Sequence, residues 1–246
     1  FLFRMFAFSD AAVPENGMEM LPRQLAVRLR AGTLETSVRA TALRRDGPGF
    51  IVETEKKVSY PTSQVVLAMD DAQVRALLGS QKGGIRASHD SAQWNRTTTF
   101  YYAAERTPVD GPLLALNGAG PSAGPVNSAI VLSQASERYA PPGAHLIAAS
   151  IVGRAPQTGP QIEQLERDAR VQLGRWFGKD VAGWTVVGGY PIVRALPLCT
   201  RAEWQQSNPR LKDGVYVCGD YREIPSIQGA LASGRRAAEA VLRHAS

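Results

Sequence analysis

The fold is decided near the C-terminus, where the chain reads Gly214-Val215-Tyr216-Val217-Cys218-Gly219-Asp220 and, after a loop, Gly229-Ala230-Leu231-Ala232-Ser233-Gly234-Arg235-Arg236-Ala237-Ala238. Val215–Cys218 is a short apolar run between glycines, which predicts a buried parallel strand. The next helix has one face almost without side chains, because small residues recur there at helical spacing: Ser226, Ala230, Ser233, Gly234 and Ala237. Ligands of open α/β sheets bind beyond the carboxyl ends of strands, where helix N-termini offer N–H groups to anions. We therefore expect a ligand site where this strand ends.

This arrangement closely resembles the C-terminal flavin motif of the superfamily of FAD-dependent amine oxidases and phytoene desaturases. The resemblance implies that FAD is the cofactor, that Gly219 and Asp220 end the last strand of its domain, and that the Asp220 carboxylate hydrogen-bonds the ribityl hydroxyls. It also implies that main-chain N–H groups at the start of the next helix cover the pyrophosphate and the flavin pyrimidine edge; they belong to Ser226, Ile227, Gly229 and Ala230. The alternative is an ordinary Gly-Asp turn before a close-packed helix.

The glycine-rich phosphate loop with which this superfamily opens, Gly-x-Gly-x-x-Gly, does not occur in these 246 residues. Gly32, Gly47 and Gly49 have another spacing, and the glycines at 118, 120 and 124 lie in a Pro-rich loop. We expect the C-terminal portion of a longer flavoprotein, or the product of truncation or gene fission, without its N-terminal nucleotide-binding half. Such a fragment alone is expected to be inactive, to hold FAD weakly or not at all, and to expose an apolar patch. The expected contributors to that patch are Phe1, Phe3, Phe6, Phe8 and the bare helix face.

Composition is that of a globular protein, with 44% hydrophobic and 20% charged residues. The net charge is +6 and the isoelectric point is near 9.6, but the basic residues are scattered, which argues against nucleic-acid binding. Cys199, Cys218 and the histidines at 89, 145 and 244 fit neither a disulfide framework nor a metal site, so no metal is expected. No apolar run has transmembrane length. We expect a cytoplasmic or plastid protein for which peripheral membrane contact stays open, with any targeting segment preceding residue 1.

The predicted fold class is α/β with mixed α+β character: a partial FAD/NAD(P)-binding Rossmann-like domain interleaved with a mixed-sheet substrate domain. Residues 1–85 are assigned to the FAD-binding domain, 86–189 to the substrate domain and 190–246 to the C-terminal part of the FAD-binding domain. The first part is expected to contain a helix over Glu19–Arg30 and the strands Thr33–Val38, Ala40–Arg45, Phe50–Thr54, Lys56–Tyr60 and Val65–Met69. The resemblance implies that Val38 lends its backbone to the adenine of FAD, and the alternative is a plain core valine.

Asp70 and Asp71 follow the last of these strands, where relatives have a small residue that lets the chain pass near the cofactor. We expect them to cap and begin a helix that runs to Leu78. Two carboxylates would repel a dinucleotide phosphate, so both are expected to face solvent and not to form an acid–base pair.

The middle of the chain predicts a mixed or antiparallel sheet that is covered by one helix. The expected strands are Thr97–Ala103, Leu113–Leu116, Ser128–Leu132 and Leu146–Val152, and the helix begins at Pro160 and ends near Gly178. Tyr190 and Leu196, on the segment that returns to the cofactor strand, are candidates for substrate contact, although sequence alone favours a core position for both. That segment has no paired Trp or Tyr that could sandwich an amine, which favours an apolar substrate.

Three functions remain open from the sequence. The first is an FAD-dependent oxidoreductase of the desaturase or isomerase type that acts on an apolar small molecule of the isoprenoid or carotenoid class. The second is a flavin amine oxidase on the same scaffold, and the third is a non-catalytic truncated flavoprotein or binding module. In such enzymes the flavin carries out the chemistry while the protein positions the substrate. No Ser/His/Asp or Cys/His arrangement predicts a competing chemistry.

Overall fold

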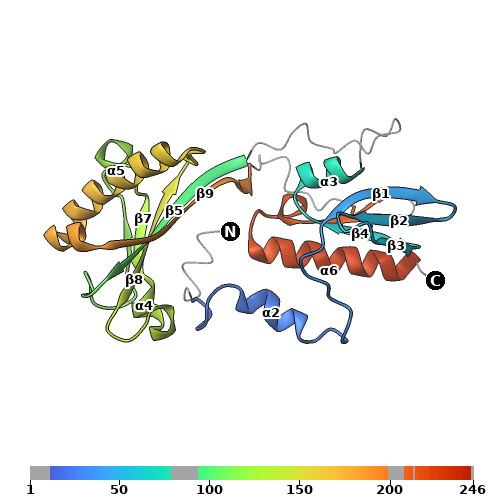
Figure 1. Cartoon of the computed structure of the whole chain (residues 1–246), viewed down its shortest axis with the longest axis horizontal. Helices are drawn as coiled ribbons and strands as arrows, with labels where there is room; N and C mark the ends of the chain where they lie inside the picture. The colour runs from blue at the N-terminus through green and yellow to red at the C-terminus, as the bar shows by residue number, and fades with distance from the viewer. Residues whose placement is uncertain (1–11, 79–93, 199–207, 213, 245–246) are drawn as a thin grey trace. The chain divides into compact units, whose positions relative to one another are not determined.

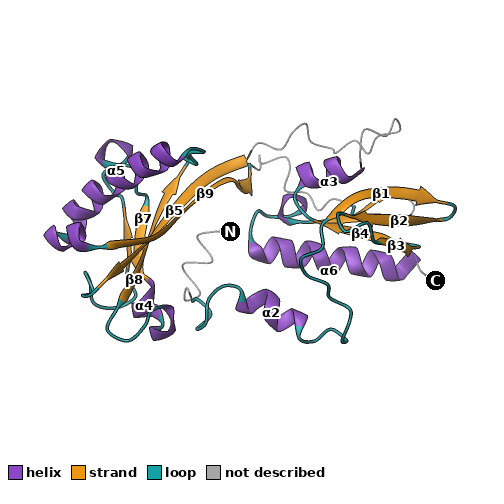
Figure 2. Ribbon diagram, in the orientation of Figure 1, coloured by secondary structure: helices purple, strands orange, loops and turns teal. Residues whose placement is uncertain are grey.

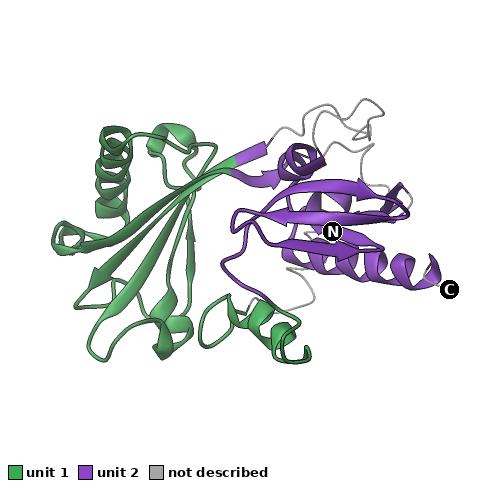
Figure 3. Cartoon of the chain, turned by 45° about the vertical axis from the view of Figure 1, so that its right-hand side comes forward, with its two compact units in different colours: residues 1–34, 96–193 green, residues 35–95, 194–246 purple. Residues whose placement is uncertain are grey.

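The structure of the chain, a computed structural model, describes residues 12–78, 94–198, 208–212 and 214–244. It divides into two compact units, one with residues 1–34 and 96–193 and the other with residues 35–95 and 194–246 (Figure 3). Helices and strands alternate along much of the chain, so the predicted α/β class is confirmed (Figure 2). The predictions that concern the phenylalanines at 1, 3, 6 and 8, His89 and Cys199 lie outside the described residues.

A five-stranded sheet with the strand order β6-β7-β8-β5-β9 makes up most of the first unit (Figure 1). From β6 to β5, neighbouring strands are antiparallel, as expected. The strands are β5 (Trp94–Ala104), β6 (Leu114–Leu116), β7 (Ser128–Val131), β8 (His145–Val152) and β9 (Thr185–Pro197). The boundaries between the units fall within β5 and β9, so that Trp94 and Arg194 belong to the second unit.

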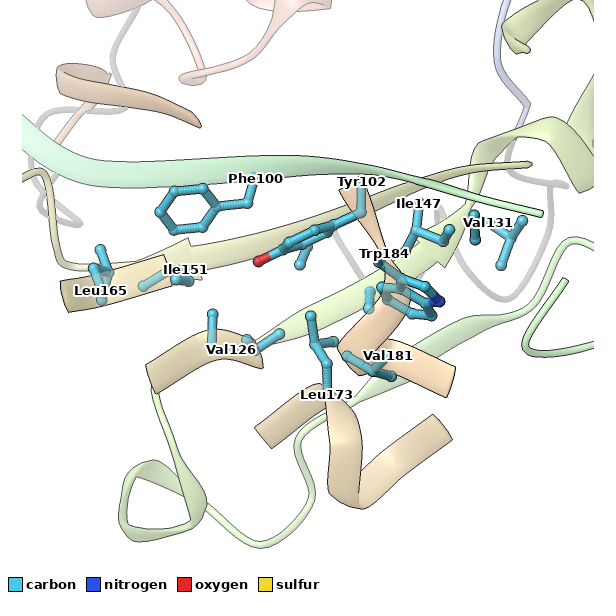
Figure 4. Packing of buried hydrophobic residues seen from close by; sticks show 14 residues of the cluster. Phe100, Tyr102, Val126, Val131, Ile147, Ile151, Leu165, Leu173, Val181 and Trp184 are labelled. Carbon is cyan, nitrogen blue, oxygen red and sulfur yellow. The ribbon is translucent and has the colours of Figure 1, made fainter. Parts of the chain in front are cut away.

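Helix α5 (Gly159–Phe177) covers one face of this sheet, as the sequence predicts. It has a proline in its first turn and Gly178 at its C-cap. Its apolar stripe packs on every second residue of the strands, and the shared core includes Phe100, Tyr102, Ile147, Ile151, Leu165, Leu173 and Trp184 (Figure 4). The smaller elements of this unit are α4 (Leu132–Ala135) and the 3-10 turns Pro121–Ala123, Glu137–Tyr139 and Lys179–Gly183.

Residues 12–34 group with this first unit, whereas the sequence assigned them to the FAD-binding domain. The reason is a set of contacts before α2 (Met20–Ala26): the Tyr139 hydroxyl donates to the Pro14 carbonyl at 2.9 Å, and the Arg138 guanidinium lies 2.8 Å from the Glu15 carboxylate. The helix ends at Ala26, shorter than the predicted Glu19–Arg30, and none of its residues is buried.

The second unit begins with an antiparallel meander of β1 (Ala40–Asp46), β2 (Gly49–Thr54) and β3 (Ser59–Thr62). The predicted strand Thr33–Val38 is not formed, because Ser37 takes a left-handed backbone conformation with φ 56°. The predicted strand Lys56–Tyr60 starts only at Ser59. Lys57 also has a positive φ, and its N–H donates to the Thr54 carbonyl at 3.0 Å, which closes a turn in its place.

A second three-stranded sheet has the order β10-β11-β4, with β10 at Arg210–Lys212, β11 at Val215–Cys218 and β4 at Val65–Ala68. β11 is parallel to β4, with Val215 opposite Val65 and Cys218 opposite Ala68. All residues of β11 are buried, which confirms the predicted buried parallel strand. β4 is buried fully only at Leu67. Helix α3 (Asp71–Leu78) follows β4 and contributes Val74 to the core shared with the meander.

Helix α6 (Ile227–His244) packs on β11 through very small residues. Its buried positions are Gly229, Ser233, Ala237 and Ala240. The Gly219 N–H donates to the Ser233 hydroxyl at 3.2 Å, which ties the end of the strand to the helix. A Cβ at Gly229 would lie 1.9 Å from the Ile224 carbonyl oxygen, so only glycine allows the preceding loop to lie this close. No helix among the described residues has the length and apolarity to cross a membrane.

Gly229→Ala is expected to destabilise the protein by about 1–3 kcal/mol, because the added methyl group overlaps the Ile224 carbonyl and the loop must shift. Gly234→Ala is the matched control on the same helix, since beyond its chain neighbours and the nearby backbone of α6 no described atom lies within 4 Å of its added Cβ. Alanine there favours the helix by about 0.5–1 kcal/mol. Urea unfolding, followed by a probe in the second unit, measures both changes. Equal stability of the two variants would contradict the role assigned to Gly229.

Candidate functional site

A cleft of about 320 Å³ lies at the carboxyl ends of β4 and β11. The ends of parallel strands meet at one edge of a sheet, where ligands of α/β proteins bind. The residues that line this cleft all belong to the second unit, and its volume is near the lower end of the range for small-molecule sites. The structure therefore places a pocket where the sequence predicted a ligand site.

Half of the residues that line the cleft have small side chains or none. They are Ala68, Ala195, Cys218, Gly219 and Ala230, which come from β4, β9, the end of β11 and α6. A wall of this kind lets a ligand approach the backbone closely. Burial raises the pKa of the Cys218 thiol, so this side chain is neutral and acts as a small apolar group.

Asp220 is the polar residue at the end of β11 and begins a short 3-10 turn over Asp220–Arg222. Burial raises the pKa of its carboxyl group, and the charge of Asp70 raises it further. The backbone N–H groups of Tyr221 and of Asp220 itself act in the opposite direction. The carboxylate is thus partly desolvated and turned toward the cleft that it lines.

Asp70 and Asp71 correct one prediction. Asp70 caps α3 as expected, since its carboxylate accepts the Gln73 N–H at 2.9 Å. It does not simply face solvent, however, because it lines the cleft with its second oxygen 3.6 Å from Nε of Arg194. Asp71 is buried and pairs with Arg75 at 2.6 Å. Each carboxylate has a guanidinium partner. The opposite charge offsets the desolvation of Asp70 beside the cleft and of Asp71 in the core.

The sequence did not single out Arg194 or Trp94 as residues of the cleft. Asp70 could have been found, because it follows a parallel strand whose carboxyl end must lie beside that of β11. Arg194 and Trp94 lie near the ends of the long strands β9 and β5, and no local pattern marks which of their residues turn toward the cofactor strand.

The start of α6 corrects a second prediction. The Ser226 hydroxyl accepts the Gly229 N–H at 2.9 Å, and the Ser226 carbonyl accepts the Ala230 N–H at 2.9 Å. These two N–H groups are therefore used within the helix and do not point to an anion. The N–H groups of Ile227 and Gln228 make no hydrogen bond with other described residues and remain as donors. Ala230 belongs to the site through its methyl group, which lines the cleft.

The remaining predicted site residues do not line the cleft. Val38 is half-buried just before β1. Tyr190 and Leu196 are 55% and 42% exposed, so the core position that the sequence favoured for both is wrong. Tyr190 lies in the first unit and makes an edge-to-face contact with Tyr101 at a ring distance of 5.7 Å, whereas Leu196 belongs to the second unit.

Comparison with known proteins identifies a family. The sequence profile of the flavin containing amine oxidoreductases matches residues 1–242. No curated protein matches the chain.

Solved structures with a similar fold include an oxidoreductase from Methanosarcina mazei, with a TM-score of 0.74 and 17% identity over 97% of this chain and 58% of that one. Putrescine oxidase bound to putrescine has a TM-score of 0.64 and 13% identity over 93% and 53%. Reduced UDP-galactopyranose mutase has a TM-score of 0.62 and 14% identity over 90% and 52%. At these identities the likeness concerns the fold alone, and the chain spans little more than half the length of these structures.

Asp220→Asn is expected to raise the unfolding temperature at pH 7. Burial disfavours the charged carboxylate in the folded protein relative to the unfolded chain, so the folded state is more stable with an uncharged group at this position. The gain should disappear as the pH falls below the ordinary aspartate pKa of 3.8, where the wild-type group is also neutral. Thermal unfolding between pH 7 and this value measures the effect, with the exposed Asp110→Asn as control. Equal behaviour of both variants would contradict the desolvated state of Asp220.

Proposed function

Since the chain belongs to the family of flavin-containing amine oxidoreductases, we propose that it forms the Asp220 side of the FAD site of an FAD-dependent oxidoreductase. The observation that carries the proposal is the partly desolvated Asp220 carboxylate in a cleft at the carboxyl ends of two parallel strands. An ionised carboxylate only accepts hydrogen bonds. It therefore suits the hydroxyl groups of a ribityl chain and not a phosphate.

Other groups, in the cleft and on the first turn of α6, support the same ligand. The N–H groups of Ile227 and Gln228 lie at the positive end of the α6 dipole, which suits pyrophosphate oxygens. Asp70 would repel an anionic cofactor, but the nearby Arg194 guanidinium offsets its charge. The small side chains of the wall leave room for a bulky ligand close to the backbone.

In such a site the residues of this chain bind and orient. When bound, a flavin supplies the acceptor for the hydride or electrons of the substrate. Asp220 would hold the ribityl hydroxyls, and the resemblance assigns the adenine to the backbone of Val38. Cys218, whose pKa is raised by burial, would stay protonated and contribute shape only.

We further propose an apolar substrate of the isoprenoid or carotenoid class, as in desaturases. The support is the face of the five-stranded sheet that lies opposite α5. The core residues of β5, β7 and β8 point toward α5, so the alternate residues point away from it. On that face the large exposed apolar side chains are Leu114, Leu116, Val152, Tyr190 and Ile192.

An amine substrate is the second candidate. The observation in its favour is the edge-to-face pair of Tyr101 and Tyr190, because aromatic rings attract a substrate cation. Calorimetric titration of the purified chain with a long-chain polyene or with putrescine separates the two proposals. Binding of the polyene alone supports the apolar class, and binding of putrescine alone supports the amine.

Asp220→Ala is expected to weaken FAD binding about tenfold or more, because a hydrogen bond to a charged group contributes about 1.5–3 kcal/mol. The purified chain is examined by visible absorption and then titrated with FAD by fluorescence, with the exposed Asp110→Ala as control. The wild-type chain is expected to be colourless as purified and to bind added FAD weakly, since it has no glycine-rich loop.

Unchanged affinity of Asp220→Ala would count against the proposed site. Isolation of a yellow protein with stoichiometric FAD would overturn the expectation of weak binding and leave the site itself in place. A folded wild-type chain that takes up no FAD would favour the non-catalytic binding module.

A further inference from the structure

We propose that Arg236 is a positioning residue, which clamps the loop before α6 and thereby sets where Asp220 stands in the cleft. The inference rests on the proposed function of the cleft as an FAD site. Arg236 does not line the cleft itself. It lies on α6, well beyond the first turn, next to the buried positions Ser233 and Ala237.

The loop over residues 219–226 carries Asp220 near its beginning and the helix cap Ser226 at its end. Its own backbone bonds are few: the Arg222 N–H donates to the Gly219 carbonyl and the Glu223 N–H to the Asp220 carbonyl, both at 3.1 Å. One 3-10 turn of this kind has little stability of its own. The position of the turn therefore depends on ties to neighbouring elements.

Arg236 supplies such a tie from the helix. One of its terminal nitrogens donates to the Arg222 carbonyl at 3.3 Å, and the other pairs with the Glu223 carboxylate. The side chains of Arg236 and Glu223 are only 20% and 13% exposed. A guanidinium that binds a backbone carbonyl and the side chain of the next residue restricts both the position and the orientation of the turn.

Two further contacts complete the clamp around the turn. Nη2 of Arg222 donates to the Asn208 carbonyl at 2.7 Å, on the side of β10. On the side of α6, the Ile224 carbonyl lies against the helix because Gly229 has no side chain. The loop is thus held by contacts to β10 and to α6. Arg236 contacts it at Glu223, three residues after Asp220.

Removal of Arg236 is expected to move the turn away from α6, and the charges of the clamp give the reason. Arg236 pairs with the Glu223 carboxylate, and burial together with the charge of Arg236 lowers the pKa of Arg222. Without Arg236, the Glu223 carboxylate would be left largely buried with no cationic partner from α6. Such a group moves toward water when its backbone allows it. The turn would then leave the helix and take Asp220 with it.

The first test is hydrogen–deuterium exchange of the purified chain without ligand. Arg236→Met should raise the exchange rates of the Arg222 and Glu223 amides about tenfold or more, because the turn that their hydrogen bonds close opens locally. Arg235→Met is the matched control: it removes the same charge at the next position, but its side chain is 76% exposed and pairs with Glu239 on the same helix. If Arg236→Met does not fold, Glu223→Gln removes the same ion pair while the Arg236 guanidinium keeps its bond to the Arg222 carbonyl, and it should raise the same exchange rates. Unchanged exchange of these two amides would overturn the clamp.

The second test compares FAD affinity by fluorescence titration. Arg236→Met should bind FAD more weakly than Arg235→Met, by about tenfold or more, because a displaced Asp220 carboxylate loses its charge-assisted hydrogen bonds to the ligand. Arg236→Lys, which keeps the charge but not the two-pronged contact, should fall between them. Faster exchange with equal FAD affinity would overturn the positioning role alone. Loss of FAD binding in the wild type and every variant would instead overturn the proposed function, and the positioning role with it.

Discussion

The parallel pairing of β4 with β11 is the constraint on which the candidate site depends. Its register places Ala68 opposite Cys218, so the residues that follow the two strands emerge at one edge although they lie far apart in the sequence. Asp70 and Asp220 reach the same cleft for this reason. None of the fourteen core residues of the first unit lines the cleft, although the strands β5 and β9 of its sheet contribute Trp94, Arg194 and Ala195 to it.

Close packing of α6 is the second requirement of the site. Because Gly229 has no side chain, the Ile224 carbonyl lies directly against the helix, and the small Ser233 accepts a hydrogen bond from the Gly219 N–H. Ala230 is also small and forms part of the cleft wall. Small residues on this helix therefore do two things at once: they bring the loop against the helix, and they leave space at the ends of the strands for a ligand.

The positions of three charged residues, Asp220, Asp70 and Arg194, set the electrostatic potential of the cleft. The charge of Asp70 raises the free energy of the ionised form of Asp220, and Arg194 lies beside Asp70. The arrangement suits a ligand that brings hydroxyl groups to one carboxylate and an anionic group to the start of α6. The proposed cofactor, FAD, has both features. The proposed apolar substrate rests on the apolar side chains that the five-stranded sheet exposes on the face opposite α5.

The sequence by itself determined the parts that depend on local pattern: the buried strand Val215–Cys218, the small-residue helix after it, helix α5, and the capping role of Asp70. These follow from side-chain period and from hydrogen bonds between near neighbours. Only the tertiary structure decided that Asp70 and Arg194 meet at the cleft and that Tyr190 is exposed. Each of these depends on which distant segment lies beside the residue, and strand register and helix packing set that neighbour while local sequence does not.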